Sequence, residues 1–189
     1  MHHDNQLMTS LPGYFTKIPN FINPTANILE NLKLGEHIIE FAGINTLLEY
    51  YVIKDVNYIL SQHIRKICNI DPTYIIYAQI TNKGLLGAHI DHGPIVNLNF
   101  YLQAAEDITH FYKKNEKVTG YQYTGQKEAN IFDYRELEHV GSFVANTNEA
   151  YLLNVSEIHS VEKVTDTKRS FISYCWHHNT YEEVLANLC

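Results

Sequence analysis

From Pro72 onward, the sequence consists of short runs of β-branched and aromatic residues separated by clusters of Gly, Asn and Asp. Such runs are typical of β-strands, and the clusters between them are typical of turns. Because no long helical pattern lies between the runs, we expect a mainly β sandwich or jelly roll rather than a parallel sheet with crossover helices. The pattern predicts seven or eight strands, at residues 74–81, 95–103, 108–112, 120–123, 142–144, 150–155, 160–164 and 169–176.

The residues before Pro72 have a different pattern, with apolar side chains at helical spacing. One helix is expected to start at Asn23-Pro24 and to end before Gly35. A second is expected after Asp55, with an apolar stripe made of Val56, Ile59, Leu60, Ile64 and Ile67. We therefore expect N-terminal α-helices, within about residues 1–71, to pack on one sheet of a jelly-roll core at about residues 72–178.

Length and charge limit the number of domains and the kinds of partner. A chain of 189 residues is the size of one domain, so a single domain over 1–189 is expected. The formal net charge of −7 opposes nucleic-acid binding, which depends on clustered Lys and Arg. No apolar run reaches the roughly 18 residues of a membrane span, and no signal-peptide pattern is present. We expect a cytoplasmic protein with no nucleic-acid or membrane partner.

The segment Ala88-His89-Ile90-Asp91 places two potential metal ligands two residues apart. Alternate side chains of an extended chain point to the same side, so His89 and Asp91 can share one metal ion. This pair alone is a weak motif, because a chain rich in His produces such pairs by chance. A second His, His159, follows 68 residues after Asp91 at the start of another predicted strand. A jelly roll can bring such distant strands together.

Two imidazoles and one carboxylate on one face of a metal ion leave three coordination positions open. Non-haem Fe(II) oxygenases use this arrangement to hold a co-substrate and O₂. A structural zinc site would close all four positions, and spacing marks no fourth ligand. The three residue types therefore favour a catalytic Fe(II) site built from His89, Asp91 and His159.

Arg169 adds a second constraint, because it lies ten residues after His159 and opens a mainly apolar predicted strand. A cation that points into a β-barrel is costly unless an anion pairs with it. A bound dicarboxylate would supply a charge-assisted and bidentate partner. The alternative is an Arg at the sheet rim, paired with a surface acid.

These four residues resemble the pattern of the 2-oxoglutarate/Fe(II)-dependent dioxygenase superfamily, which has His-x-Asp, a distal His and an Arg or Lys about ten residues later. The match spans roughly residues 74–176, and its local segments resemble small prolyl-hydroxylase-like members of bacteria and phages. The resemblance implies a double-stranded β-helix, a cupin-like jelly roll. It also implies that His89, Asp91 and His159 bind Fe(II), that Arg169 binds 2-oxoglutarate, and that O₂ is the oxidant. The carboxylate of Asp91 favours hydroxylation over halogenation within this superfamily.

One departure concerns the residue that assists Arg169. Many members with this Arg have Arg-x-Ser, whereas this chain has Arg169-Ser170-Phe171. Another hydroxyl must therefore take the place of that serine, and the candidates are Tyr77 and Ser173. Asn97 and Asn99 alternate along the strand after the metal motif, where an inward amide could bind the proximal carboxylate of 2-oxoglutarate; the alternative is an amide satisfied within the sheet.

Two other functions are compatible with the same residues. A non-catalytic jelly-roll protein could use this face to bind a sugar or a protein and would not need the metal triad. A cupin-like metalloenzyme could keep the three ligands without using 2-oxoglutarate or Arg169. For an oxygenase we expect hydroxylation of a small molecule, an amino acid or a peptidyl side chain, with release of succinate and CO₂; the sequence does not define the substrate further.

Overall fold

The computed structural model describes residues 8–21, 34–41, 43–44, 47–53, 58–115 and 130–189. Most of these residues lie in antiparallel strands, and helices are few. The strands are β1 (Ser10–Leu11), β2 (Phe15–Lys17), β3 (Leu34–Phe41), β4 (Gly43–Ile44), β5 (Leu47–Ile53), β6 (Tyr74–Thr81), β7 (Gly84–Ile90), β8 (Val96–Gln103), β9 (Asp107–Lys114), β10 (Asn130–Ile131), β11 (Leu137–Ala145), β12 (Ala150–Asn154), β13 (Ile158–Lys163) and β14 (Arg169–Trp176). The helices are α2 (Tyr58–Arg65), α3 (Tyr181–Ala186) and a 3-10 turn at Tyr134–Glu136.

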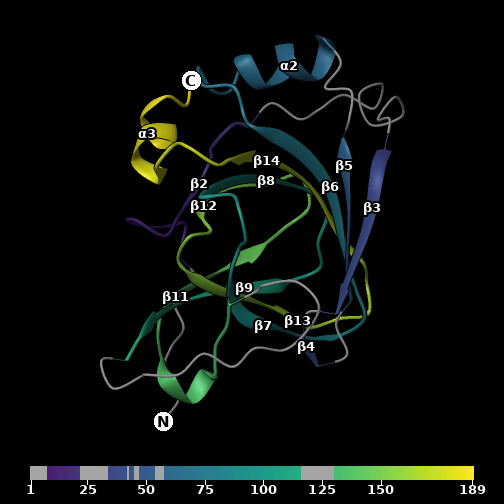
Figure 1. Ribbon diagram of the computed structural model, residues 1–189, viewed down its shortest axis with the longest axis vertical. Helices are drawn as coiled ribbons and strands as arrows, with labels where there is room; N and C mark the ends of the chain where they lie inside the picture. The colour runs from purple at the N-terminus through teal and green to yellow at the C-terminus, as the bar shows by residue number, and fades with distance from the viewer. Residues whose placement is uncertain (1–7, 22–33, 42, 45–46, 54–57, 116–129) are drawn as a thin grey trace.

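Two antiparallel sheets face each other and enclose an elongated barrel (Figure 1). The larger sheet has the strand order β1-β2-β12-β8-β14-β6-β5-β3. The smaller sheet has the order β10-β7-β13-β9-β11, and β4 also pairs with β7. From β6 to β14 the chain passes back and forth between the two sheets, with β9, β10 and β11 all in the smaller one, in the manner of the jelly roll that the sequence pattern predicts.

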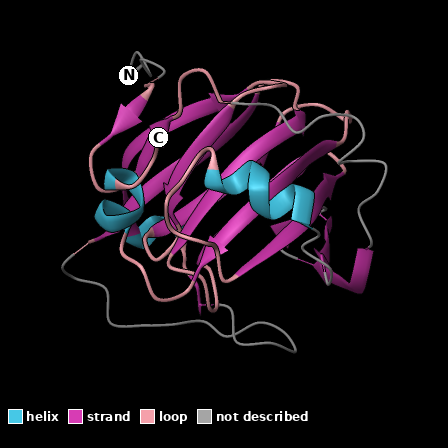
Figure 2. Cartoon of the chain, turned by 90° about the horizontal axis from the view of Figure 1, so that it is seen from above, coloured by secondary structure: helices cyan, strands magenta, loops and turns pink. Residues whose placement is uncertain are grey.

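Helices α2 and α3 cover the outer face of the larger sheet (Figure 2). Ile64 of α2 and Val184 of α3 are fully buried in one apolar cluster with Phe100 and Trp176 from the sheet. A capping box at Thr180 and Glu183 fixes the start of α3, because each side chain bonds the other residue's backbone N–H. This apolar packing leaves the inner face of the same sheet to line the barrel.

A second apolar cluster fills the space between the two sheets. Its centre is aromatic: the Phe15 ring stacks on Phe111 at 5.5 Å between centroids, and Phe143 stacks on Tyr151 at 4.0 Å. Side chains alternate along each strand, so one set of residues serves this cluster and the other set faces outward. The inner set is therefore the source of any site within the barrel.

The sequence predicts most strands of the core but misses β7, β10 and the strands of the N-terminal region. The expected strands 74–81 and 169–176 are confirmed at both ends as β6 and β14, and a second helix is present as α2. The expectation of a mainly helical cover before residue 72 is wrong for the described part of that region, where β3 and β5 extend the larger sheet. These strands form because β5 pairs along the edge of β6, a tertiary contact that helical spacing does not reveal.

Three further expectations lie partly or wholly outside the described residues. The helix expected from Asn23-Pro24 and the strand expected at 120–123 fall there entirely. Of the apolar stripe expected in the second helical region, Ile64 and Ile67 are buried in the outer cluster.

No helix in the part of the chain that the structure describes is long and apolar enough to cross a membrane.

Candidate metal centre

Three side chains converge where strands β7 and β13 lie side by side. His89 lies near the end of β7, Asp91 follows directly after that strand, and His159 lies near the start of β13. The two strands are antiparallel, and His159 pairs directly with His89. The backbone N–H of Asp91 donates to the Val155 carbonyl at 3.1 Å, which holds the chain after β7 against the barrel. Strand pairing thus closes the long sequence gap between the ligands.

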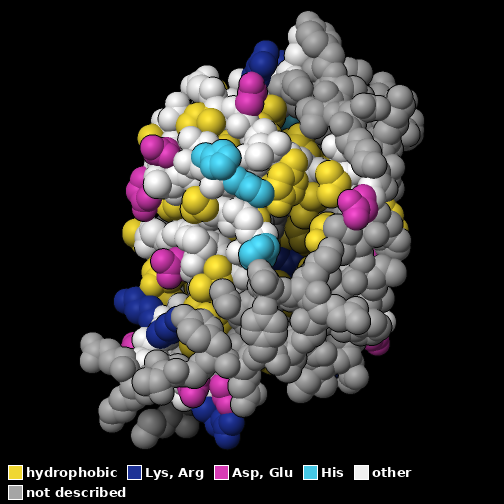
Figure 3. All heavy atoms as spheres, viewed as in Figure 1, with side chains coloured by type: hydrophobic (Ala, Val, Ile, Leu, Met, Phe, Trp, Pro, Cys, Tyr) yellow, Lys and Arg dark blue, Asp and Glu magenta, His cyan; other side chains and the backbone are white. Residues whose placement is uncertain are grey.

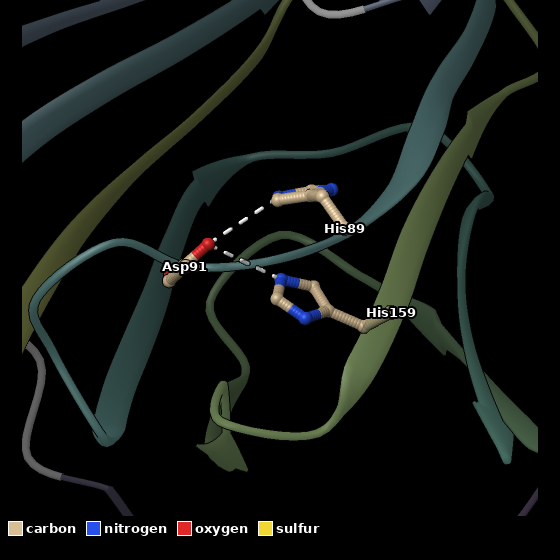
Figure 4. A group of neighbouring side chains, drawn as sticks. All are labelled: His89, Asp91 and His159. Atoms are coloured by element: carbon tan, nitrogen blue, oxygen red, sulfur yellow. Dashed lines mark ion pairs between the residues drawn. The ribbon is translucent and has the colours of Figure 1, made fainter. Parts of the chain in front are cut away.

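The three side chains point toward one another (Figure 4). Asp91 Oδ1 lies 3.3 Å from His89 Nε2 and 3.5 Å from His159 Nε2. One ligand atom from each residue falls within 4.8 Å of the other two, a spacing at which a single ion can bind all three. The described residues thus contain the His-Asp-His triad that the sequence predicts.

Hydrogen bonds on the far side of each ligand fix its orientation. The Nδ1–H of His89 donates to the Gly87 carbonyl at 2.7 Å, and that of His159 donates to the Glu157 carbonyl at 3.0 Å. Both rings therefore direct Nε2 toward Asp91. Asn97 donates from Nδ2 to Asp91 Oδ2 at 3.1 Å and leaves Oδ1 directed at the two imidazoles. Such outer partners are characteristic of metal-binding His and carboxylate residues.

Electrostatics also favour the protonation states that bind a metal. Burial, together with the neighbouring His89, lowers the pKa of His159 to about 4. Burial acts to raise the pKa of the Asp91 carboxyl, but interactions with His89, His159 and Asn97 hold it below its usual range. At neutral pH the site therefore offers a neutral imidazole from His159 and an ionised carboxylate, the forms in which these groups coordinate metals.

Arg169 lies deeper in the barrel, at the start of β14, and is only 2% exposed. Its Nη2 donates to Tyr101 Oη at 2.9 Å and to Thr109 Oγ1 at 3.0 Å, while its guanidinium carbon lies 4.7 Å from the centre of the Tyr101 ring. Its Nε and Nη1 groups are buried without a hydrogen-bond acceptor among the described residues. A buried guanidinium with free donors is costly, and a carboxylate could accept a charge-assisted hydrogen bond from one of them.

Strand register places Arg169 relative to the triad. On the neighbouring strands β9 and β13, His159 pairs with Phe111 and Val161 pairs with Thr109, which bonds Arg169. We call the level of His159 and Phe111 the metal row. The level of Val161 and Thr109, where Arg169 is bonded, is a second row two residues below it, about 7 Å along the strands. A five-carbon dicarboxylate could chelate a metal at the upper row and reach the guanidinium at the lower one.

The remaining expected site residues divide between the two faces of the larger sheet. Asn99 and Ser173 pair across β8 and β14 on the inner face, midway between Asn97, which bonds Asp91, and Tyr101, which bonds Arg169. The Oδ1 atoms of Asn97 and Asn99 are buried without a donor among the described residues. These free polar atoms fit a polar ligand between the two rows.

Tyr77 is placed on the other face of its strand. It pairs with Ile172 and packs against the outer apolar cluster, so we leave it out of the site.

The hydroxyl groups that bond Arg169 come instead from Tyr101 and Thr109, which the sequence analysis does not identify. Local sequence gives no signal for either, because their partner is more than fifty residues away along the chain.

A hollow opens into the barrel on the face viewed in Figure 3. Hydrophobic side chains border its upper side, a His side chain lies at its rim and a basic side chain is visible within it. A separate cleft of about 800 Å³ lies on the outer face of the smaller sheet, lined in part by His110, Tyr112, His139 and Glu162. Because the outward side chains of β9 and β13 line that cleft, the sheet separates it from the metal triad.

No protein-family model matches the sequence, and no curated protein matches it. Solved structures match over most of the chain. An oxidoreductase of the 2OG-Fe(II) oxygenase family from Burkholderia pseudomallei has 10% sequence identity and a TM-score of 0.52, over 88% of this chain and 86% of its own. HygX from Streptomyces hygroscopicus, with nickel and 2-oxoglutarate bound, has 13% identity and a TM-score of 0.50, over 89% and 85%. The epimerase SnoN, in complex with Fe³⁺, alpha ketoglutarate and nogalamycin RO, has 12% identity and a TM-score of 0.56, over 86% and 78%.

At these identities the comparisons establish the fold, which is that of 2-oxoglutarate/Fe(II) oxygenase structures. This confirms the double-stranded β-helix that the sequence motifs imply. Two of the similar proteins bind both a metal ion and 2-oxoglutarate, and this chain has a His-Asp-His triad that could hold a metal ion. The combination of cofactors expected from the sequence therefore agrees with the proteins that share the fold.

Proposed function

We propose that the protein is an Fe(II)- and 2-oxoglutarate-dependent oxygenase. Its substrate is a small molecule, a free amino acid or a peptidyl side chain, and its reaction is hydroxylation with release of succinate and CO₂. The observation that carries the proposal is the pairing of a His-Asp-His triad with a buried Arg169, whose free donors lie about 7 Å deeper in the same barrel. Neither feature alone requires an oxygenase, but together they match the two ends of 2-oxoglutarate.

Each residue has a defined task in this proposal. His89, Asp91 and His159 hold the metal on one face, and Asn97 fixes the orientation of the Asp91 carboxylate. Arg169 binds the distal carboxylate through a donor that the described residues leave free, at Nε or at Nη1, which lie on opposite edges of the guanidinium. The Tyr101 hydroxyl holds the guanidinium in place and takes the role of the serine that the chain lacks two residues after Arg169.

Iron and 2-oxoglutarate supply the oxidising chemistry, and the protein supplies geometry and a dry cavity. The aromatic cluster around Phe111 and Tyr101 excludes water beneath the metal row. Because one of the similar proteins is an epimerase, hydroxylation depends on how the substrate is placed over the metal rather than on the triad itself. The carboxylate of Asp91 fills a coordination position and favours transfer of a hydroxyl group.

Conversion of 2-oxoglutarate to succinate tests the proposal directly. Purified protein with Fe(II), ascorbate and O₂ should release succinate, slowly without a substrate and faster with one. Arg169→Met should raise the KM for 2-oxoglutarate by at least about a hundredfold, because the charge-assisted pairing with the distal carboxylate is lost. His178→Ala is the matched control, since this exposed histidine lies beyond β14 and is not one of the three residues of the triad.

Two results would contradict the proposal in different ways. Iron binding without any succinate release, across a broad substrate panel, would favour a cupin-like metalloenzyme. Wild-type levels of iron binding in His159→Ala would leave the triad without a role and favour a non-catalytic binding protein.

A further inference from the structure

Two side chains that are readily oxidised lie next to each other on the larger sheet. Tyr74 on β6 and Cys175 on β14 are directly opposite one another in an antiparallel pair of strands. Directly opposed residues of such a pair share one face of the sheet, and their Cβ atoms are about 4.5–5.5 Å apart. A phenol and a thiol are therefore neighbours, and neither has a task in the metal centre described above.

Strand alternation turns both side chains into the barrel. Their neighbours along the chain, Ile75 on β6 and Trp176 on β14, are buried in the apolar cluster under the helices. Alternate residues of a strand face opposite ways, so Tyr74 and Cys175 belong to the inner set. Cys175 is 0% exposed there. An oxidant that reaches this thiol must therefore come from inside the barrel.

The pair lies at the level of the metal ligand Asp91. On its other side, Cys175 is directly opposite Asn97 of β8, and the Asn97 amide donates to Asp91 Oδ2 at 3.1 Å. Burial raises the pKa of both the Tyr74 hydroxyl and the Cys175 thiol, and the nearby Asp91 carboxylate adds to both shifts. One side chain, that of Asn97, thus connects the thiol to the metal centre.

The surroundings of Cys175 keep it a neutral thiol. Burial raises its pKa to about 12, although hydrogen bonds with Ser173 and Tyr74 act to lower it. Sγ lies 3.5 Å from the Ser173 hydroxyl and donates to the Ser173 carbonyl at 3.8 Å. Cysteine is a nucleophile only as the thiolate, so this residue is unsuited to nucleophilic chemistry. It can instead give up its hydrogen to an oxidant.

We propose that turnover without a substrate joins Cys175 Sγ to the Tyr74 ring carbon beside the hydroxyl, in a thioether cross-link. The inference rests on the proposed function, because 2-oxoglutarate and O₂ supply the oxidising power. With no substrate in the barrel, oxidation falls on side chains near the metal. The bond ties β6 to β14 at the level of Asp91 and so fixes this wall of the substrate space.

The reaction balances with the co-substrates of the proposed function alone. The S–H bond of Cys175 and one ring C–H bond of Tyr74 break, and a carbon–sulfur bond forms. One 2-oxoglutarate and one O₂ are consumed, and succinate, CO₂ and water are released. One oxygen atom of O₂ enters succinate, and the other leaves as water with the two hydrogens. The side-chain pair and 2-oxoglutarate each lose two electrons, and O₂ gains four.

Mass spectrometry tests the proposal with a readout other than activity. Protein produced without O₂ is incubated with Fe(II), 2-oxoglutarate, ascorbate and O₂, and is then analysed whole and after digestion. The intact mass should fall by that of two hydrogen atoms. The peptides that contain residues 74 and 175 should appear as one joined species. Omission of 2-oxoglutarate or of O₂ should prevent both changes.

Paired variants identify the two residues that react. Cys175→Ala and Tyr74→Phe should each abolish the mass loss, the second because a ring without the hydroxyl is much harder to oxidise. Cys68→Ala is the control for the first, since Cys68 is also 0% exposed but lies in the outer cluster. Tyr77→Phe is the control for the second, since Tyr77 lies on the same strand and packs against that cluster. Both controls should cross-link as wild type does.

Three results would overturn the inference while the proposed function stands. One is succinate release with Tyr74 and Cys175 unchanged. Another is the gain of an oxygen atom on either residue in place of the loss of two hydrogens. The third is a cross-link that forms without 2-oxoglutarate. A wild-type protein that binds iron but releases no succinate is a separate result, since it contradicts the proposed function and the inference with it.

Discussion

The two faces of strand β8 have opposite characters. Its outward side chains, Val96, Leu98 and Phe100, are at most 1% exposed and pack in the apolar cluster under the helices. Its inward side chains are Asn97, Asn99 and Tyr101, which are also buried but polar. The outer face has no unpaired polar atom in this strand, whereas the inner amides each bury an Oδ1 without a donor among the described residues.

The outer side chains of β8 therefore stabilise the fold, whereas its inner side chains are available to bind a ligand in the barrel. Burial of the outer side chains is favourable at roughly 25 cal/mol per Å² of apolar surface. Each unpaired buried amide oxygen instead costs about 1–3 kcal/mol. In β8 such groups occur on the inner face only, where a polar ligand could bond them. Substitutions on the two faces should therefore have different effects.

The largest effect is expected on the outer face. Phe100→Ala should lower the free energy of unfolding by about 3–5 kcal/mol, because it leaves a cavity beneath Phe21, whose ring stacks on Phe100 at 5.1 Å. Urea denaturation would measure the loss. In the folded fraction of this variant, metal affinity should stay near wild type, and a marked fall would mean that the two faces are not separable.

His159→Ala should have the largest effect on ligand binding. Loss of one of three ligands should reduce metal affinity by more than the roughly 10–100-fold that an outer partner contributes. Calorimetric titration with Mn(II) would measure it, with His178→Ala as the control. Affinity within a few-fold of wild type would show that the metal binds elsewhere.

Asn97→Ala tests the inner face of β8 itself. The variant removes the amide that bonds Asp91 Oδ2, and metal affinity should fall by about 10–100-fold while the triad stays intact. The same titration applies. An unchanged affinity would make the bond to Asp91 a packing contact rather than an orienting one.

Asn99→Leu should have the smallest effect, and its two consequences should be opposite in sign. The metal-free protein should become more stable by about 1 kcal/mol, because an unpaired buried amide is replaced by an apolar group of similar shape. Affinity for 2-oxoglutarate should fall by up to about tenfold. A loss of stability together with unchanged affinity would mean that Asn99 is an ordinary part of the core.

The sequence predicts best where local signals suffice. Strands β6 and β14 have clear β-branched and aromatic runs between turn residues, and their bounds match the prediction. Strand β7, which carries His89, contains two glycines and is not predicted, because its extended form depends on pairing with β13. The three ligands were identified by residue type and spacing, without knowledge of the strand that holds the first of them.

Contacts between distant residues account for what the sequence misses. Tyr101 and Thr109 bond Arg169 across 68 and 60 residues, and no local pattern marks a side chain for such a partner. Tyr77 has the hydroxyl that a sequence search would choose, but strand alternation turns it to the outer cluster. A one-residue difference in register would have reversed that outcome.

The most direct test of the account is an anaerobic titration of the Fe(II)-loaded protein with 2-oxoglutarate, monitored by visible absorption. The account predicts that a charge-transfer band of a chelated 2-oxo acid appears and saturates at one equivalent per iron, and that Arg169→Met requires far more 2-oxoglutarate to produce it. Iron that stays bound while no band develops in the wild-type protein would contradict the assignment of the barrel to 2-oxoglutarate.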